Sequence, residues 1–152
     1  MAVWVKKTGG MGSLYRSRHE LVFMFKVDDK PHINNVMLGS HGRNRSNVWE
    51  YAGFSRLAND DPEALEHPTP KPVRLLADAI LDVTNRNDVV LDPFGGSGST
   101  LIAAERTGRR ARLIELEPRF VDLTIRRWQR LTGKKAVHAR TRQRFDLVAA
   151  EK

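Results

Sequence analysis

The stretch LDPFGGSGST, residues 91–100, decides the fold of this chain. It continues an apolar run that starts at Val89, turns through three glycines, and leads into the helix-prone segment TLIAAER. A glycine-rich turn between a strand and a helix is a common place for an α/β protein to hold a polar or anionic ligand. The sequence therefore predicts a ligand site at this turn, and the rest of the chain must indicate which ligand it is.

Strands and helices alternate around the turn. Three segments have the composition of strands: DVVLD (88–92), ARLIEL (111–116) and AVHA (136–139). Helices are expected over 98–107, ended by Gly108, and from Pro118 to about Leu131, ended by Gly133. Such an alternation predicts a parallel sheet with right-handed crossovers. On the second helix we expect an apolar stripe of Val121, Ile125 and Trp128, with Phe120 and Trp128 in the core.

A further helix is expected just before the first of these strands, within residues 67–84. Thr69 is a suitable N-cap and Pro70 a suitable first helical residue. Apolar residues at helical spacing form one face, namely Val73, Leu76, Ala77, Ile80 and Leu81. His67 is interpreted as a structural histidine at the entrance of the helix.

The N-terminal part is predicted to differ from this pattern. AVWV (2–5) and ELVFMFKV (20–27) read as strands that form a hairpin, and the second is apolar enough to be buried on both faces. Residues 28–66 are polar and lack a sustained period, so we expect a long loop there, with aromatic residues gathered at 47–54.

Composition limits the class of protein. The 152 residues, 40% of them hydrophobic, suffice for one core but not for two comfortable domains. The chain has no cysteine, and its five histidines lack metal-ligand spacing, so we expect no disulfide and no metal site. No apolar run approaches the roughly 20 residues that span a membrane, and no signal peptide is recognisable at the N-terminus. We expect a soluble cytoplasmic protein.

The charge points to a polyanionic partner. Lys and Arg number 26 against 18 Asp and Glu, a net charge of +8 that favours nucleic acid. The basic residues form four clusters: Arg43/Arg45, Arg109/Arg110/Arg112, Arg126/Arg127/Arg130/Lys134/Lys135 and Arg140/Arg142/Arg144. One cluster alone is typical of a solvated surface, whereas four together favour nucleic acid. The 28–66 region contains side chains of the types that contact bases and phosphates, namely Asn34, Asn35, Arg43, Asn44, Arg45 and Asn47. The last four are the candidate DNA-binding residues.

Three kinds of ligand use such a glycine turn. A phosphate loop for ATP or GTP needs a lysine before the Ser/Thr, and here Gly98 is followed directly by Ser99. A dinucleotide fingerprint needs a third glycine where Leu101 stands, which weakens that interpretation. S-adenosylmethionine needs glycines only for close backbone approach, with Asp92 placed for its ammonium group and Glu115 for its ribose hydroxyls.

The segment LDPFGGSGSTLIAAERTGRRARLIELEPRF (91–120) resembles the cofactor motif of amino-methylating DNA methyltransferases, D-P-F-x-G-S-G-[ST]-T. HPTPKPV (67–73) resembles their second cofactor motif, H-P-[ST]-x-K-P. This order is that of the circularly permuted, beta-class enzymes. GMGSLYRSRHELVFMFK (10–26) and NRSNVWEY (44–51) are similar to segments of their bacterial and phage adenine-specific members.

The resemblance implies an α/β, Rossmann-like methyltransferase fold, incomplete here, with a mainly parallel sheet and an N-terminal antiparallel hairpin. It implies S-adenosylmethionine as cofactor, with Thr69 and Lys71 near the methionine carboxylate. It also implies that Glu115 takes the ribose and that the cofactor is lined by Asp92, Phe94, Gly96, Gly98 and Ser99. The chain is then one partial domain: hairpin strands 1–27, a loop and DNA-recognition region 28–66, a cofactor-binding half 67–139 and a basic tail 140–152.

One motif of the family is missing. These enzymes hold the flipped-out base with a [DNS]-P-P-[YFW] loop, and the sequence contains no Pro-Pro pair. The chain therefore resembles the C-terminal part of a methyltransferase and has no catalytic residue of its own. The family's sheet also has two strands between those at 88–92 and 20–27. Without them, the apolar edge of the 88–92 strand is expected to be exposed.

Three functions remain open from the sequence. The first is a truncated or split, site-specific adenine-N6 DNA methyltransferase of a bacterial restriction–modification system or a phage, active only with the missing N-terminal part. Its candidate partners are DNA, that catalytic part and another copy of itself. The second is a remnant that binds cofactor or DNA without turnover. The third is a nicotinamide-dependent oxidoreductase. The sequence does not decide between adenine N6 and cytosine N4, between DNA and RNA, or which site is recognised.

Overall fold

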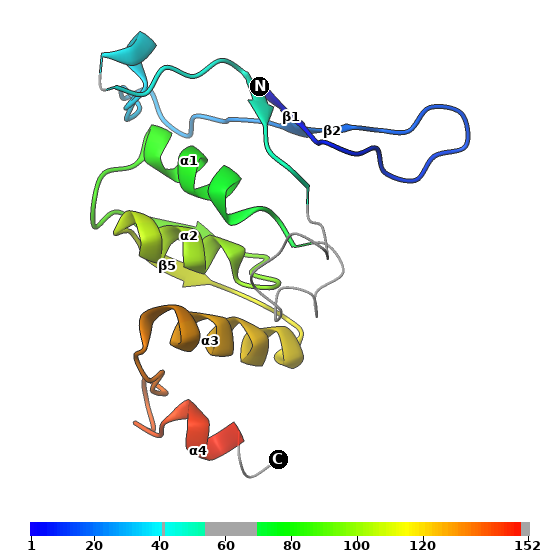
Figure 1. The fold of residues 1–152 in the computed structure, drawn as a ribbon. Helices are drawn as coiled ribbons and strands as arrows, with labels where there is room; N and C mark the ends of the chain where they lie inside the picture. The colour runs from blue at the N-terminus through cyan, green and yellow to red at the C-terminus, as the bar shows by residue number, and fades with distance from the viewer. Residues whose placement is uncertain (41, 54–69, 150–152) are drawn as a thin grey trace.

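The computed structural model describes residues 1–40, 42–53 and 70–149 (Figure 1). It is an α/β fold with two small sheets, and its strands are β1 (Ala2–Val5), β2 (His19–Val22), β3 (Val48–Glu50), β4 (Val89–Asp92) and β5 (Arg110–Leu113). The helices are α1 (Val73–Val83), α2 (Ser99–Thr107), α3 (Pro118–Thr132) and α4 (Phe145–Ala149), with a short 3-10 turn, η1, at Met37–Gly39.

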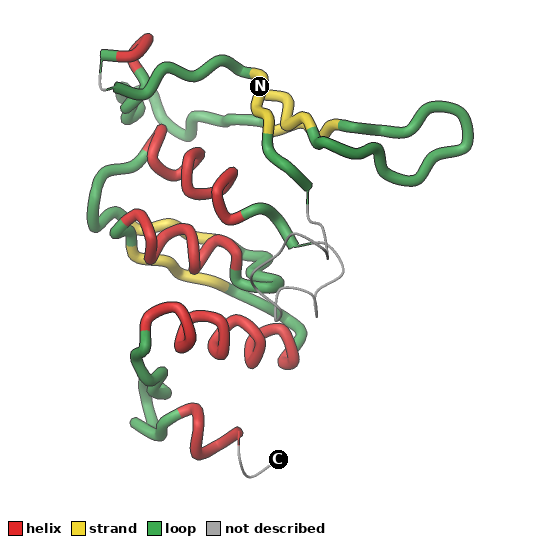
Figure 2. The backbone as a smooth tube through the Cα atoms, viewed as in Figure 1, coloured by secondary structure: helices red, strands yellow, loops and turns green. Residues whose placement is uncertain are grey.

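The two sheets have different topologies (Figure 2). The N-terminal sheet has the order β2-β1-β3, in which β1 runs antiparallel to β2 and parallel to β3. The second sheet contains only β4 and β5, which are parallel and joined by α2. The predicted fold class, with a hairpin followed by parallel strands and crossover helices, is confirmed.

Helix α1 joins the two halves. One side of it packs against the N-terminal sheet, where Leu75 is buried with Ala2, Trp4 and Trp49. Ala2 and Trp4 alternate with half-buried residues, the period expected of a strand with one buried face. The other side of α1 packs along α2, as Figure 1 shows. The cofactor-motif half is thus fastened to the N-terminal sheet through one helix.

The glycine stops were predicted correctly. Helix α2 ends at Gly108 and α3 at Gly133, both with the left-handed backbone that caps helices. The start of α1 was predicted wrongly, since Pro72 is the N-cap and Val73 the first helical residue. Proline disfavours helical geometry in the residue before it, so Pro72 keeps Lys71 out of the helix, and a helix begun at Pro70 could not continue into α1. Thr69, the expected N-cap, lies outside the described residues.

Two predictions for the N-terminal part were wrong in extent, one of a strand and one of a loop. The segment 20–27 is a strand only as far as Val22, and Phe23 and Phe25 are exposed rather than buried on both faces. The reason is that β2 is an edge strand, and no described element covers the residues that follow it. The 28–66 region is not all loop, because Val48–Glu50 forms β3 against β1.

The region after Gly133 also differs from expectation. AVHA (136–139) contributes a single antiparallel bridge, Val137 with Arg144, and not a parallel strand. The segment expected to be a basic tail contains α4. On α3, Val121 is exposed and the buried positions are Leu123 and Arg127, so the predicted stripe was misplaced.

The expected exposed edge is present. Within the described ranges, β4 has a strand partner on one side only, and its residues Val89 and Leu91 are 51% and 64% exposed. No helix in these ranges is both long enough and apolar enough to cross a membrane.

Candidate functional site

The glycine turn joins the end of β4 to the start of α2. Gly96 and Gly98 have φ of +52° and +77°, a region that side-chain-bearing residues rarely adopt. The Gly98 amide closes the turn by donating to the Gly95 carbonyl at 2.8 Å. The chain therefore reverses over a few residues and enters α2 with the helix N-terminus beside the turn.

Two carboxylates stabilise this turn from consecutive strand ends. Asp92, the last residue of β4, accepts from the Phe94 amide at 2.9 Å and from the Thr100 hydroxyl at 2.6 Å. Glu115, just after β5, accepts from the Gly96 amide at 2.6 Å and from the Glu117 amide at 2.9 Å. Because β4 and β5 are parallel, their carboxyl ends lie at one edge and both acids reach the same turn.

A cavity of about 480 Å³ opens at this edge. Six of the eight residues predicted to bind the cofactor line it, namely Lys71, Asp92, Phe94, Gly96, Ser99 and Glu115. Gly98 is not part of the lining and instead lies against the side chain of Thr124. The eighth, Thr69, is outside the described residues.

Several lining residues were not predicted. Phe120 was assigned to the core, but it is half-buried and lines the cavity together with Leu76. Its position in the first turn of α3, shortly after the strand-end acid, was the signal that could have placed it there. Thr100 also lines the cavity and holds Asp92, a role that a serine/threonine-rich helix start could have suggested.

Lys71 links the cavity to the N-terminal sheet. Its ammonium lies 3.4 Å from Glu20 of β2, which also pairs with Lys6 at 2.6 Å. Partial burial disfavours the ionised form of Glu20, but the hydrogen bond from Lys6 and the charge of Lys71 outweigh burial and lower its pKa. A ligand carboxylate at Lys71 would therefore compete with Glu20 for one ammonium group.

The residues predicted to contact DNA lie elsewhere, near the surface of α1 that faces β3. Arg43 donates to Asp82 at 2.7 Å and to the Asp78 carbonyl at 3.0 Å. Arg45 donates to the Tyr51 hydroxyl at 2.8 Å and lies 2.9 Å from Asp82. These contacts give both arginines a structural role in joining the 28–66 region to α1, which the sequence did not reveal.

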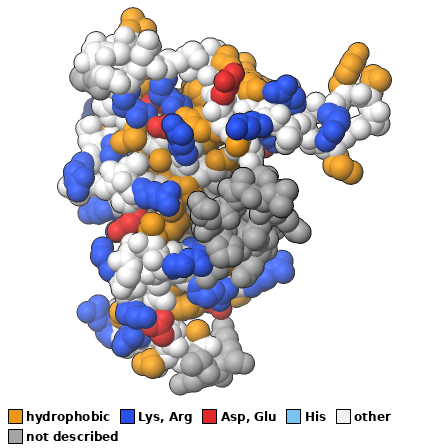
Figure 3. Space-filling model, viewed as in Figure 1, with side chains coloured by type: hydrophobic (Ala, Val, Ile, Leu, Met, Phe, Trp, Pro, Cys, Tyr) orange, Lys and Arg blue, Asp and Glu red, His pale blue; other side chains and the backbone are white. Residues whose placement is uncertain are grey.

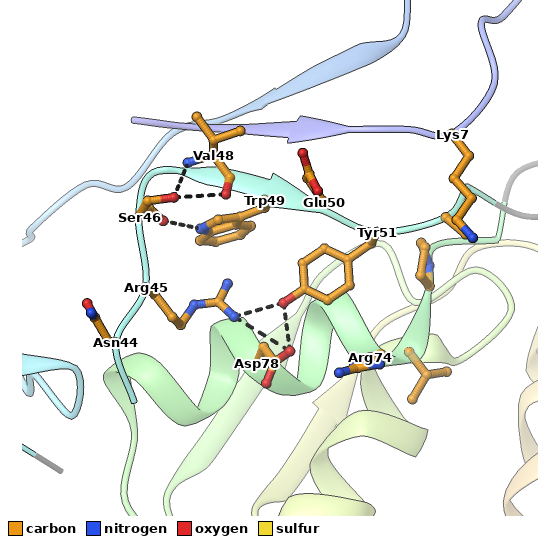
Figure 4. Close-up of a pocket in the computed structure, with 13 residues that line it drawn as sticks. Lys7, Asn44, Arg45, Ser46, Val48, Trp49, Glu50, Tyr51, Arg74 and Asp78 are labelled. Atoms are coloured by element: carbon orange, nitrogen blue, oxygen red, sulfur yellow. Dashed lines mark hydrogen bonds and ion pairs between the residues drawn. The ribbon is translucent and has the colours of Figure 1, made fainter. Parts of the chain in front are cut away.

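The same cluster contains aromatic rings (Figure 4). The Arg45 guanidinium is 4.8 Å from the centre of the Trp49 ring, and Tyr51 donates to Asp78 at 2.6 Å. Burial, followed by the hydrogen bond to Asp78, raises the pKa of the Tyr51 hydroxyl. A cavity of about 780 Å³ lies beside these residues and also includes Asn44. The Asn47 carbonyl accepts from Val3, and DNA contact by the four residues stays a prediction.

The described residues were also compared with the requirements of a metal site. No group of three His, Asp or Glu side chains among them could hold an ion. The cavity at the glycine turn instead combines two carboxylates, one ammonium, a helix N-terminus and two aromatic rings. That donor set suits a zwitterionic ligand with an attached flat ring.

Comparisons with known proteins point to one family. A family profile described as DNA methylase matches residues 1–126. The chain is 30% identical to type II methyltransferase M.HpaI of Haemophilus parainfluenzae, over 79% of this chain and 42% of that protein. It is 36% identical to DNA adenine methyltransferase YhdJ of Escherichia coli K12, over 58% of this chain and 29% of that protein. The chain thus spans less than half the length of these curated relatives.

Solved structures share the fold. PvuII DNA methyltransferase, described as cytosine-N4-specific, superposes with a TM-score of 0.67 at 20% identity, over 81% of this chain and 48% of its own. The complex of M1.HpyAVI with S-adenosylmethionine gives 0.56 at 23% identity, over 84% and 60%. A modification methylase from Thermus thermophilus, complexed with S-adenosylmethionine and described as putative, gives 0.51 at 26% identity, over 85% and 52%.

Proposed function

The chain belongs to the N6/N4 DNA methylase family, and from this premise we propose that it is the cofactor-binding part of a site-specific DNA methyltransferase. Its cofactor is S-adenosylmethionine and its substrate is an exocyclic amino group of DNA. The observation that supports the proposal most directly is the convergence of Asp92, Glu115 and the glycine turn on one cavity.

The donor set fits S-adenosylmethionine. A cofactor with an ammonium, a carboxylate, a ribose and an adenine ring needs one acidic, one basic and one diol-accepting group beside apolar walls. Asp92 and Lys71 would supply the charges, Glu115 would accept from the ribose, and Phe94 and Phe120 would offer apolar walls for the ring, since all five residues line the cavity. The start of α2, which has no side-chain cap, adds the positive end of a helix dipole that favours a carboxylate. The volume of about 480 Å³ lies in the range of small-molecule sites.

Each of these residues positions the cofactor and none reacts with the base. S-adenosylmethionine supplies an electrophilic methyl group on its sulfonium sulfur. Asp92 is itself held by Thr100, so its carboxylate is oriented before any ligand arrives. Each Glu115 carboxylate oxygen accepts from one backbone amide, that of Gly96 or Glu117, and a carboxylate oxygen can accept a second hydrogen bond, so Glu115 could also accept from the ribose hydroxyls. The chain thus contributes affinity and orientation to methyl transfer.

The base-holding groups come from outside these 152 residues in this proposal, because the sequence lacks a Pro-Pro pair and the loop motif that contains it. We propose adenine N6 as the methylated atom, because the chain is 36% identical over 58% of its length to YhdJ, which is described as a DNA adenine methyltransferase. We place the enzyme in the bacterial cytoplasm, encoded by the bacterium or by a phage, with DNA as its substrate.

Isothermal calorimetry of the 152-residue chain with S-adenosylmethionine tests the cofactor assignment. We expect saturable binding that Glu115→Gln weakens by about tenfold or more, because a charged hydrogen-bond acceptor is replaced by a neutral one. Glu117→Gln is the matched control, since Glu117 is a nearby exposed carboxylate outside the cavity lining, and it should bind as the unchanged chain does. A folded chain that shows no binding, or equal binding in both variants, would rule out the assignment.

A further inference from the structure

Two side chains of helix α3 donate hydrogen bonds to the backbone of the glycine turn. The Thr124 hydroxyl donates to the Gly96 carbonyl at 3.1 Å. One turn further along the helix, the Arg127 guanidinium donates to the Ser97 carbonyl. Arg127 is 3% exposed, an unusual degree of burial for a charged side chain. Two consecutive carbonyls of the turn therefore point toward α3 and have their hydrogen bonds there.

Close packing accompanies these hydrogen bonds. A Cβ atom at Gly98 would lie 2.5 Å from the Thr124 methyl carbon and 2.7 Å from its hydroxyl oxygen. Nothing larger than glycine therefore fits at Gly98 while Thr124 stays in place. The backbone of the turn and the surface of α3 are thus fitted to one another along residues 96–98.

The orientation of the carbonyls determines the orientation of an amide. In a planar trans peptide, the C=O of one residue and the N–H of the next point in opposite directions. Because the Gly96 carbonyl points to Thr124, the Ser97 N–H points away from α3, and Ser97 itself lines the cavity. The next peptide, between Ser97 and Gly98, is fixed in the same way, because Arg127 holds the Ser97 carbonyl. The Gly98 N–H of that peptide donates to the Gly95 carbonyl and closes the turn.

We propose that Thr124 and Arg127 are positioning residues for the cofactor turn. They do not line the cavity, and they act by fixing the peptides that shape the turn beside the ligand. This inference rests on the proposed cofactor, since its functional readout is the affinity for S-adenosylmethionine. By this inference α3, which follows β5, controls the shape of the glycine turn, which follows β4.

Paired substitutions separate positioning from mere structural support. Thr124→Val keeps the shape and removes the hydroxyl, whereas Thr124→Ser keeps the hydroxyl. Arg127→Lys keeps the charge but loses the planar fork of donors. Arg126→Gln is the control, on the exposed neighbour in the same helix. We expect Thr124→Val and Arg127→Lys to weaken S-adenosylmethionine binding by about tenfold each, with Thr124→Ser and Arg126→Gln within about twofold of the unchanged chain.

Amide hydrogen exchange by NMR supplies a readout without cofactor. In the two weakened variants, the Ser97 and Gly98 amides should exchange about tenfold faster or more, while amides in α1 keep their rates. Variants that lower the melting temperature but bind and exchange like the unchanged chain would overturn the inference and leave only a structural role. If the unchanged chain binds no S-adenosylmethionine, the cofactor proposal fails, and the exchange rates still decide whether α3 fixes the turn.

Discussion

At the scale of the residue, Gly98 shows how backbone and packing can require the same amino acid for different reasons. Its φ of +77° is unfavourable for any residue with a side chain, and its hydrogen atoms face Thr124 where a Cβ would clash. Gly133, at the end of α3, has a similar φ of +69° but nothing within 4 Å of a Cβ. The pair therefore separates the backbone requirement from the packing requirement.

Replacement of these two glycines by alanine should give unequal losses. Gly133→Ala should lower the free energy of unfolding by about 1 kcal/mol, the backbone penalty alone. Gly98→Ala should lower it by about 2–4 kcal/mol, because overpacking against Thr124 adds to that penalty. Urea titrations monitored by circular dichroism measure both. Equal losses would mean that Thr124 moves aside at no cost.

The Arg43–Arg45–Asp78–Asp82 cluster makes a second residue-scale prediction. Asp82 is 9% exposed and compensates two guanidinium groups, so Asp82→Asn leaves positive charge partly buried without its nearest carboxylate. We expect a loss of about 2 kcal/mol in the free energy of unfolding, less than for fully buried pairs because the arginines retain some solvent contact. Asp29→Asn, at an exposed position, serves as the control in the same titration and should change little.

At the scale of the element, sequence patterns predicted what depends on local rules. The strand–glycine–helix succession at β4 and α2, and the glycine stops of α2 and α3, follow from capping chemistry and periodicity. Strand β3 was not predicted, because a three-residue strand exists only through its pairing with β1, a contact between distant segments. The burial of Arg127 could not be predicted either, because its partner is the carbonyl of Ser97, which is distant in the sequence.

In the candidate site, too, some residues could be predicted from local patterns and others could not. Asp92, Glu115 and the glycines could be assigned from a motif, and six assigned residues do line one cavity. The roles of Arg43 and Arg45 could not be read from composition, because whether an arginine is available to DNA depends on the acids that the fold brings to it.

Helix α4 is anchored by an acid, which makes its attachment sensitive to pH. Asp146 accepts from Gln129 of α3 at 2.8 Å and pairs with Lys135 at 2.9 Å. The hydrogen bonds from Lys135 and Gln129 lower the pKa of Asp146 to about 2. A carboxyl whose pKa is lower in the folded state stabilises that state above its unfolded pKa, near 4, and the stabilisation disappears as the pH falls toward about 2.

Asp146→Asn should therefore lower the melting temperature at about pH 7, and the difference from the unchanged chain should shrink between about pH 4 and about pH 2. Melting curves at half-unit steps measure this, with Asp29→Asn, at an exposed position, as the control. A constant difference across this range would show that Asp146 acts through its shape and not through its charge.

At the scale of the whole molecule, exposed apolar side chains occur on many elements, and two groups of them stand out. Figure 3 shows Lys and Arg side chains spread over several elements of the visible face, with hydrophobic side chains prominent on the arm that projects between β1 and β2. A second apolar surface lies on the β4–β5 sheet and just beyond it, where Leu91, Ile114 and Leu116 are exposed. Parallel sheets are normally covered on both faces, so this surface favours association.

Leu91→Lys should therefore reduce concentration-dependent association of the isolated chain. A charge on an open strand discourages pairing with another chain, and this side chain is 64% exposed, so the fold should tolerate the change. Light scattering over a wide range of protein concentrations compares it with Val83→Lys, at an exposed position at the end of α1. If both variants associate as the unchanged chain does, the contact between copies lies elsewhere.

The separation into two sheets also bears on the order in which the molecule folds. Val89 pairs with Arg110 across one intervening helix, whereas Val3 must find Val48 across the whole hairpin and the segment after it. Closing the longer loop costs more chain entropy, and topologies with distant contacts form more slowly. Helices α1 to α3 with β4 and β5 should therefore assemble first and present α1 as a finished surface. The N-terminal strands, although synthesised earlier, would dock onto it last.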